Sequence, residues 1–163
     1  MRRMIACALI SVLLAGCALG EVLGDDGEPA DLAVTDVVGS WRSGSSRSIT
    51  FAKDRGFVAV DLPYPVFEDF VETDFDPSRA RLDGSGTWRL TNTSDQAGAG
   101  GSKVLLRFTS LAGESIGPVE VELTALRRDD VVSLIFFYVG SGGNSWTAYQ
   151  RCGSACGSAS PRR

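Results

Sequence analysis

The sequence predicts an all-β domain built from eight antiparallel strands. Residues 37–151 contain eight short runs rich in β-branched and aromatic residues, separated by turn residues at fairly even intervals. This spacing is typical of an antiparallel sandwich or barrel. In the sixth run, residues 119–125, apolar and polar side chains alternate strictly, which indicates a strand with one buried face and one solvated face.

The length and the charge of the chain limit what this domain can be. Removing a sixteen-residue leader, described below, from the 163 residues leaves enough chain for one ordinary domain. The leader contains two of the 16 basic residues and none of the 20 acidic ones, so 14 basic and 20 acidic residues remain, a net charge of −6. The phosphates of nucleic acid repel an acidic domain. We therefore expect no nucleic-acid partner.

Residues 1–16 have the features of a secretory signal. Two arginines precede an apolar run at residues 4–14, and small residues follow it. The run is shorter than the roughly 20 residues that a membrane-spanning helix needs. The motif Leu14-Ala15-Gly16-Cys17 resembles a bacterial lipobox. The resemblance implies that the Cys17 thiol receives diacylglycerol, that the chain is cut after Gly16 and that the new amino terminus is acylated.

A lipid on Cys17 would determine where the protein lies. Each buried methylene of an acyl chain contributes about 0.8 kcal/mol, and two or more chains anchor a protein stably. We expect the protein at the cell membrane, lipid-anchored on the extracytoplasmic face. The alternative is an ordinary signal peptide with a coincidental cysteine at position 17.

The first three strands are predicted to follow a tether. Residues 17–36 are small, acidic and rich in glycine, which favours a flexible linker. Strands are then predicted at residues 37–41, 48–53 and 57–62. Asp54-Arg55-Gly56, between the second and the third strand, is a hairpin signal.

A long connection at residues 63–84 interrupts this rhythm with a mixture of aromatic and acidic side chains. Phe67, Phe70 and Val71 stand at i, i+3 and i+4, so one helical turn would lay all three on the domain and turn the acids to water. Together with Phe75, the two phenylalanines could form a lid over a binding site. A plug that closes an open barrel end is the alternative.

Five further strands complete the predicted domain, at residues 85–91, 103–111, 119–125, 131–139 and 146–151. The run at 131–139 is apolar on both faces. This pattern indicates a central strand or one that another part of the protein covers.

The tail, residues 152–163, is small and polar, and we expect it to be disordered. It holds Cys152 and Cys156, the two cysteines that remain if Cys7 leaves with the signal and Cys17 is lipidated. In an oxidising compartment the two thiols can close a small disulfide ring, and two free thiols are the alternative. A metal site is not expected, because the chain has no histidine and no second cysteine pair.

The residue types needed for common catalytic sites are missing. Without histidine, neither a Ser-His-Asp nor a Cys-His arrangement can be built. The adjacent acids Glu68-Asp69 and Asp129-Asp130 are interpreted as solvated turn residues. We therefore expect no enzymatic activity and no cofactor.

Two short motifs, one in the first and one in the last predicted strand, resemble the lipocalins and the wider calycin group. They are Gly39-Ser40-Trp41 and Tyr149-Gln150-Arg151. The resemblance implies an eight-stranded up-and-down barrel at residues 37–151, in which Trp41 closes one end and Arg151 stacks on its indole. Gly39 would permit a close approach or an unusual backbone angle. The overall pattern is most similar to small lipocalin-like lipoproteins of actinobacteria.

The resemblance leaves two functions open. In the first, an apolar or amphipathic small molecule lies inside the barrel, and its candidate lining residues are Trp88, Phe108, Leu123 and Phe136. In the second, the barrel is filled and serves as a structural or protein-interaction module that contacts envelope partners through acidic loops. An internal void would favour the first function, and large inward side chains would favour the second.

Overall fold

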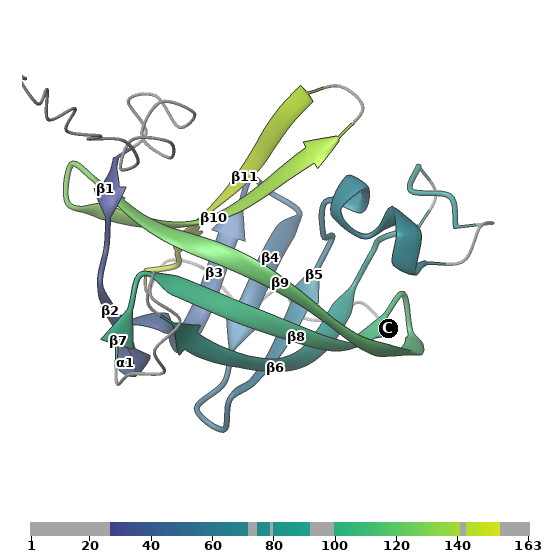
Figure 1. The fold of residues 1–163 in the computed structure, drawn as a ribbon, viewed down its shortest axis with the longest axis horizontal. Coiled ribbons are helices and arrows are strands. Elements are labelled where there is room, and N and C mark those ends of the chain that lie inside the picture. Colours follow the sequence, from purple (N-terminus) through teal and green to yellow (C-terminus); the bar gives the residue numbers. More distant parts are fainter. Residues whose placement is uncertain (1–26, 72–74, 79, 92–99, 141–142, 154–163) are drawn as a thin grey trace, which may run out of the picture.

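The computed structural model describes residues 27–71, 75–78, 80–91, 100–140 and 143–153. Eight antiparallel strands form a closed barrel (Figure 1), in the order β3 Gly39–Ser43, β4 Arg47–Phe51, β5 Gly56–Val60, β6 Gly84–Thr91, β8 Lys103–Leu111, β9 Glu114–Arg128, β10 Val131–Gly140 and β11 Gly143–Arg151. Each strand pairs with the next along the chain, and β11 pairs with β3. The predicted eight-stranded up-and-down barrel is confirmed, and its strand order is compatible with a lipocalin-like fold.

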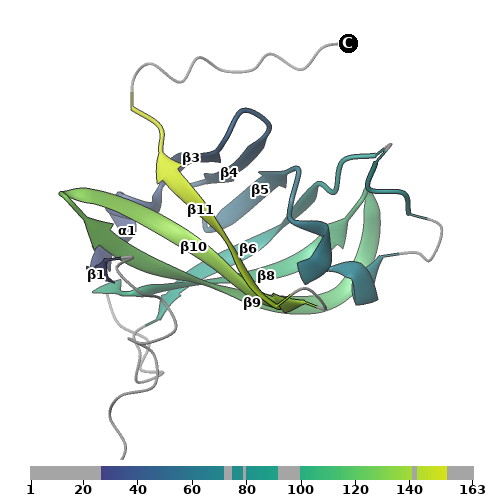
Figure 2. The ribbon, with the colours of Figure 1, turned by 90° about the horizontal axis from the view of Figure 1, so that it is seen from above.

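A short seam closes the barrel between its first and last strands. Two residue pairs join β11 to β3, Gln150 with Arg42 and Arg151 with Trp41. The amide of Cys152 extends the seam by donating to the carbonyl oxygen of Ser40 over 2.8 Å. Figure 2 shows β3, β4 and β5 on one side of the interior, with β8, β9 and β10 on the other.

Tight turns explain why the long strands pair with their sequence neighbours. Asp129 and Asp130 join β9 to β10 with φ angles of 48° and 65°, and Ala112 and Gly113 join β8 to β9 with φ angles of 53° and 88°. Two consecutive positive φ angles characterise the type I′ hairpin turn, whose twist matches that of the strands. Aspartate and glycine are among the residues that adopt this backbone conformation most readily.

The predicted tether, residues 17–36, is ordered in its second part, so that prediction is wrong from Gly27 onward. Here the chain forms β1 Glu28–Pro29, β2 Leu32–Ala33 and the short helix α1 Val34–Val37. β1 pairs with β9, and β2 pairs with β7, Gly100–Gly101. Ala30, which lies between the two strands, and Leu32 in β2 are buried. Apolar packing and ladder hydrogen bonds therefore order this segment, although its composition resembles that of a linker. Residues 17–26 lie outside the described part of the chain.

The connection between β5 and β6 lies at the end of the barrel opposite α1 (Figure 1). It contains two 3₁₀ turns, η1 Tyr64–Val66 and η2 Glu68–Phe70, where the sequence predicted one helical turn. Phe67 stands between the two turns, and its amide donates to the carbonyl oxygen of Tyr64 over 2.8 Å. None of the helices in the described ranges is long or apolar enough to cross a bilayer.

Candidate functional site

The four residues predicted to line a cavity meet inside the barrel, but they form its core. The exposed fraction is 3% for Trp88 and 0% for Phe108, Leu123 and Phe136. They come from β6, β8, β9 and β10, whose inward positions face one another across the interior. The structure therefore brings the predicted residues together and packs them against each other.

Seven aromatic side chains form a continuous chain of ring contacts through this interior, which we call the aromatic chain. Successive centroids lie 5.5, 6.5, 4.9, 4.9, 6.2 and 5.9 Å apart, in the order Trp88, Phe51, Phe57, Phe108, Phe67, Phe136 and Tyr149. These distances are typical of rings in direct contact. All seven side chains are at most 3% exposed. Large rings thus occupy the positions where a ligand would lie in an open barrel.

The three predicted lid residues have different surroundings. Phe67 is fully buried and its ring meets those of Phe108 and Phe136, which makes it part of the aromatic chain. Phe70 remains 48% exposed, so it does not lie on the domain as the predicted helical turn required. Phe75 is partly buried and stacks on Tyr64 with centroids 5.7 Å apart. The two short turns place Phe67 inward, as a plug, and leave Phe70 at the surface.

Trp41, Arg151 and Gly39 lie together where the seam meets α1. The buried Trp41 indole donates to the carbonyl oxygen of Val37 over 2.8 Å. Gly39 has a φ of 130°, a conformation that favours glycine, and a side chain there would begin 3.8 Å from the Arg151 guanidinium.

The guanidinium of Arg151 donates hydrogen bonds to backbone carbonyl oxygens where the resemblance implied a stack on Trp41. Its Nη2 reaches Val38 at 3.0 Å and Thr35 at 3.4 Å. Within the described ranges, the cation–π contact joins Arg55 to Trp88, with 4.6 Å between the guanidinium carbon and the ring centroid. Arg151 therefore ties α1 to the last strand through the backbone.

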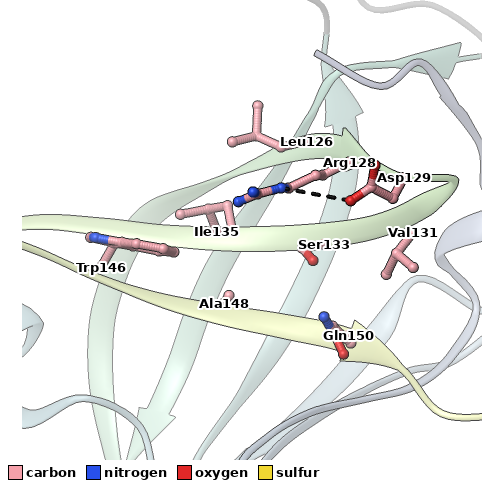
Figure 3. A pocket seen from close by; sticks show the side chains of 9 residues that line it. All are labelled: Leu126, Arg128, Asp129, Val131, Ser133, Ile135, Trp146, Ala148 and Gln150. Carbon is pink, nitrogen blue, oxygen red and sulfur yellow. Dashed lines mark ion pairs between the residues drawn. The ribbon is translucent and has the colours of Figure 1, made fainter. Parts of the chain in front are cut away.

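A groove of about 390 Å³ lies on the outer face of β9, β10 and β11. Figure 3 shows its lining, with Trp146 toward one end, Val131 and Gln150 toward the other, and Ile135 and Ala148 between them. An exposed ion pair between Arg128 and Asp129, 3.8 Å long, borders it and contributes little to stability. The full lining is Leu126, Arg128, Asp129, Val131, Ser133, Ile135, Trp146, Ala148 and Gln150.

This outer face carries large apolar side chains that remain in water. The exposed fraction is 47% for Val131, 39% for Phe137 and 50% for Trp146. Phe137 and Trp146 are directly opposed on β10 and β11, so they lie side by side on one face of the hairpin. The prediction that residues 131–139 form a central strand is confirmed, because β10 pairs with β9 on one side and with β11 on the other. Val131 and Phe137 on its outer face are nevertheless exposed.

A second groove, of about 350 Å³, lies between the connection and the β8–β9 turn. Its lining combines the exposed Phe70 with the turn residue Ala112 and the carboxylate of Glu114. The remaining residues around it are Val71, Phe75, Leu111, Ser115 and Ile116. Two of the three predicted lid residues, Phe70 and Phe75, therefore line an external groove.

Among the described residues, one buried side-chain polar atom inside the barrel lacks a hydrogen-bond partner. The hydroxyl of Tyr149 is fully buried, and no hydrogen-bonding group in the described part of the chain reaches it. Burial raises the pKa of this phenol above its ordinary value of 10.0. Within the described residues, no three Asp, Glu, Cys or His side chains are grouped so that they could hold a metal ion.

The cysteine predictions fall mostly outside the described residues. Cys152 is disulfide-bonded. Cys156, its predicted partner, and Cys17, the predicted lipidation site, both lie in segments that are not described.

Comparisons of this chain with protein-family models, with curated proteins and with solved structures found no match. We therefore infer the function from the fold and the surfaces of this chain.

Proposed function

We propose that this protein is an extracytoplasmic lipoprotein, anchored through Cys17, whose filled barrel is a structural scaffold that binds its partners on its outer surface. The aromatic chain is the observation that carries the scaffold part of this proposal. Rings with centroids 4.9 to 6.5 Å apart leave no room for a ligand between them. A ligand would have to displace the Phe67 ring from its contacts with Phe108 and Phe136.

The sequence supports the anchor and argues against catalysis. Leu14-Ala15-Gly16-Cys17 follows an apolar leader of the right length for a signal. The chain has no histidine, and the paired acids Asp129 and Asp130 form an exposed turn. We infer that the protein acts by binding and not by catalysis.

Binding of an apolar or amphipathic small molecule is a second candidate function, and the groove of Figure 3 is the observation that favours it. Its volume of about 390 Å³ lies within the range of small-ligand sites, roughly 300–1,000 Å³. The indole of Trp146 and the side chain of Ile135 provide apolar contacts, and Ser133 and Gln150 provide polar ones. This site would hold its ligand outside the barrel.

Titration with apolar fluorescent probes tests the location of binding. If binding is external, any saturable binding is lost in Trp146→Ser and kept in Phe67→Ser, provided that Phe67→Ser remains folded in a parallel urea curve. The filled-barrel proposal would be overturned by saturable binding of one probe per barrel, if Phe67→Ser lowers the free energy of probe binding more than it lowers the free energy of unfolding.

Cell fractionation tests the anchor separately. Cys17→Ser should move the protein from the membrane fraction to the soluble extracytoplasmic fraction. Mass spectrometry of the mature wild-type protein should find Cys17 at the amino terminus, carrying acyl chains. An unmodified amino terminus beyond Cys17 would contradict the anchor.

A further inference from the structure

The β10–β11 hairpin extends beyond its neighbouring strands. β10 pairs with β9 only over residues 131–136, and β11 pairs with β3 only at Gln150 and Arg151. Residues 137–140 and 143–146, which we call the hairpin arm, pair with each other, and no other ladder joins them within the described part of the chain. Figure 1 shows the arm projecting away from the barrel.

The arm displays an aromatic pair within an uncharged segment. Phe137 and Trp146 are directly opposed and are 39% and 50% exposed. Residues 131–150 contain no Asp, Glu, Lys or Arg, although the chain as a whole is 22% charged. The two rings together expose on the order of 200 Å². A stable protein interface needs about 800 Å² from each partner, so two such arms would not by themselves hold a dimer.

We infer that the hairpin arm inserts Phe137 and Trp146 into the interface of the bilayer that carries the Cys17 lipid. This inference rests on the proposed anchor. Tryptophan and phenylalanine are suited to this position, because the rings enter the acyl boundary while the indole N–H remains among the headgroups. An arm without charges enters without the cost of desolvating an ion.

The length of chain before the barrel makes this contact geometrically accessible. Nine residues, 18–26, separate Cys17 from Gly27, which makes ten steps from one Cα to the next. They span at most about 35 Å when extended and about 17 Å on average as a flexible chain. The chain then enters the barrel through β1, which pairs with β9, the neighbour of β10. Leu126 of β9, which pairs with β1, also faces Ser133 of β10, so four residue steps along β10, about 13 Å, lie between this point and Phe137. The extended tether is long enough to span this distance.

Charge is also compatible with this orientation. The chain after the leader carries a net charge of −6, and the charge-free segment contributes none of it. Anionic headgroups repel acidic surfaces within a Debye length, about 8 Å at physiological ionic strength. The arm therefore brings no charged side chain of its own toward such a membrane.

Tryptophan fluorescence of the lipidated protein in vesicles tests this orientation. The vesicles contain phosphatidylglycerol and phosphatidylcholine, the latter with brominated acyl chains that quench nearby indoles. The chain has three tryptophans, and Trp41 and Trp88 are only 1% and 3% exposed, so a change in emission reports Trp146. Emission should shift to shorter wavelength and be quenched, and Trp146→Phe should remove both effects.

Matched variants locate the contact on the arm. Phe137→Ser should reduce quenching of Trp146 by at least about threefold, because half of the apolar area that enters the bilayer is lost. Val58→Ser, which changes a 57% exposed apolar residue on β5, should leave the quenching unchanged. Equal effects of the two substitutions would overturn the inference.

Flotation of the vesicles separates this inference from the anchor. If wild-type protein floats with the vesicles and Trp146 is not quenched, the arm inference is wrong and the anchor stands. If Cys17 carries no lipid, the anchor is wrong, and the protein is mixed with preformed vesicles. Quenching of Trp146 in this mixture would support insertion of the arm without the anchor, and the absence of quenching would overturn the arm inference as well. The arm inference would also be overturned if the protein in solution had the mass of two chains and if Trp146 emission were already blue-shifted before lipid is added. A second copy of the chain would then cover Phe137 and Trp146.

Discussion

The two faces of the β10–β11 hairpin carry similar side chains in opposite surroundings. On the inner face, Leu134, Phe136 and Tyr149 are fully buried. On the outer face, Val131, Phe137 and Trp146 remain between 39% and 50% exposed, although Ile135 on the same face is only 4% exposed. The difference shows that apolar content does not decide burial in this strand pair, because a closed barrel has a fixed number of inward positions and the buried core, of which the aromatic chain is a part, fills them. Apolar residues beyond that number face outward and are available for binding.

The adjacent residues Phe136 and Phe137 provide the sharpest test of this comparison. Phe136→Ala should lower the free energy of unfolding by about 3–5 kcal/mol, because it removes a fully buried ring from the core. Phe137→Ala, one position away on the outer face, should lower it by about 1 kcal/mol or less, the contribution of its cross-strand contact with Trp146. Urea denaturation of both variants measures the difference. Similar losses would mean that something covers the outer face, contrary to the structure.

Phe67 and Phe70 in the connection between β5 and β6 provide a second comparison of a buried and an exposed phenylalanine. Phe67→Ala should cost about 3 kcal/mol, because its ring joins Phe108 to Phe136, whereas Phe70→Ala should cost less than about 0.5 kcal/mol. The free energies come from the same denaturation experiment. A small cost for Phe67→Ala would show that the connection is a loosely held lid and not a plug.

Of the substitutions of buried residues considered, Tyr149→Phe should change the free energy of unfolding the least at neutral pH, and its effect should depend on pH. At neutral pH, Tyr149→Phe should leave stability unchanged or raise it by about 1 kcal/mol, because the buried hydroxyl has no partner in the described part of the chain. Burial raises the pKa of this phenol in the folded state, so above pH 10.0, its ordinary value, the unfolded chain loses the proton first. Stability present below that pH should therefore fall as the pH rises further.

Comparison of the wild type with Tyr149→Phe across this alkaline range isolates the Tyr149 contribution. The variant should lose less stability than the wild type above pH 10.0. Parallel alkaline curves for wild type and Tyr149→Phe would show that water reaches this hydroxyl, contrary to its burial.

The strand order was predictable because each strand has a local signal. Turn residues such as Asp129-Asp130 and alternation over residues 119–125 identify strands that pair with their sequence neighbours. β1 and β2 could not be found in this way, because two-residue strands have no periodicity. β9 begins at Glu114, five residues before the start of the predicted strand at residue 119. The sequence does not indicate this earlier start, because Gly117 and Pro118 interrupt the alternation of apolar and polar residues.

The site depended on facts that are not local in sequence. Helical spacing relates Phe67 to Phe70, but it does not say which ring faces the barrel, and the 3₁₀ turns decide that. Whether inward rings fill the interior depends on how seven side chains from several strands meet. The exposed pair of Phe137 and Trp146 follows from the short ladders on either side of the arm. A sequence pattern indicates which faces are apolar, but packing in three dimensions determines which of them are covered.

The short seam also sets an order of events in folding. Of the eight strands, β3 is synthesised first and β11 last, and the hydrogen bond from Arg151 to Val38 spans 113 positions of the chain. The seven earlier strands can form local hairpins, but the sheet has two open edges until β11 is available to join β3. A chain that is still being synthesised cannot close this barrel until its last strand is available. Closure is therefore a step of the whole chain, after the local hairpins have had time to form.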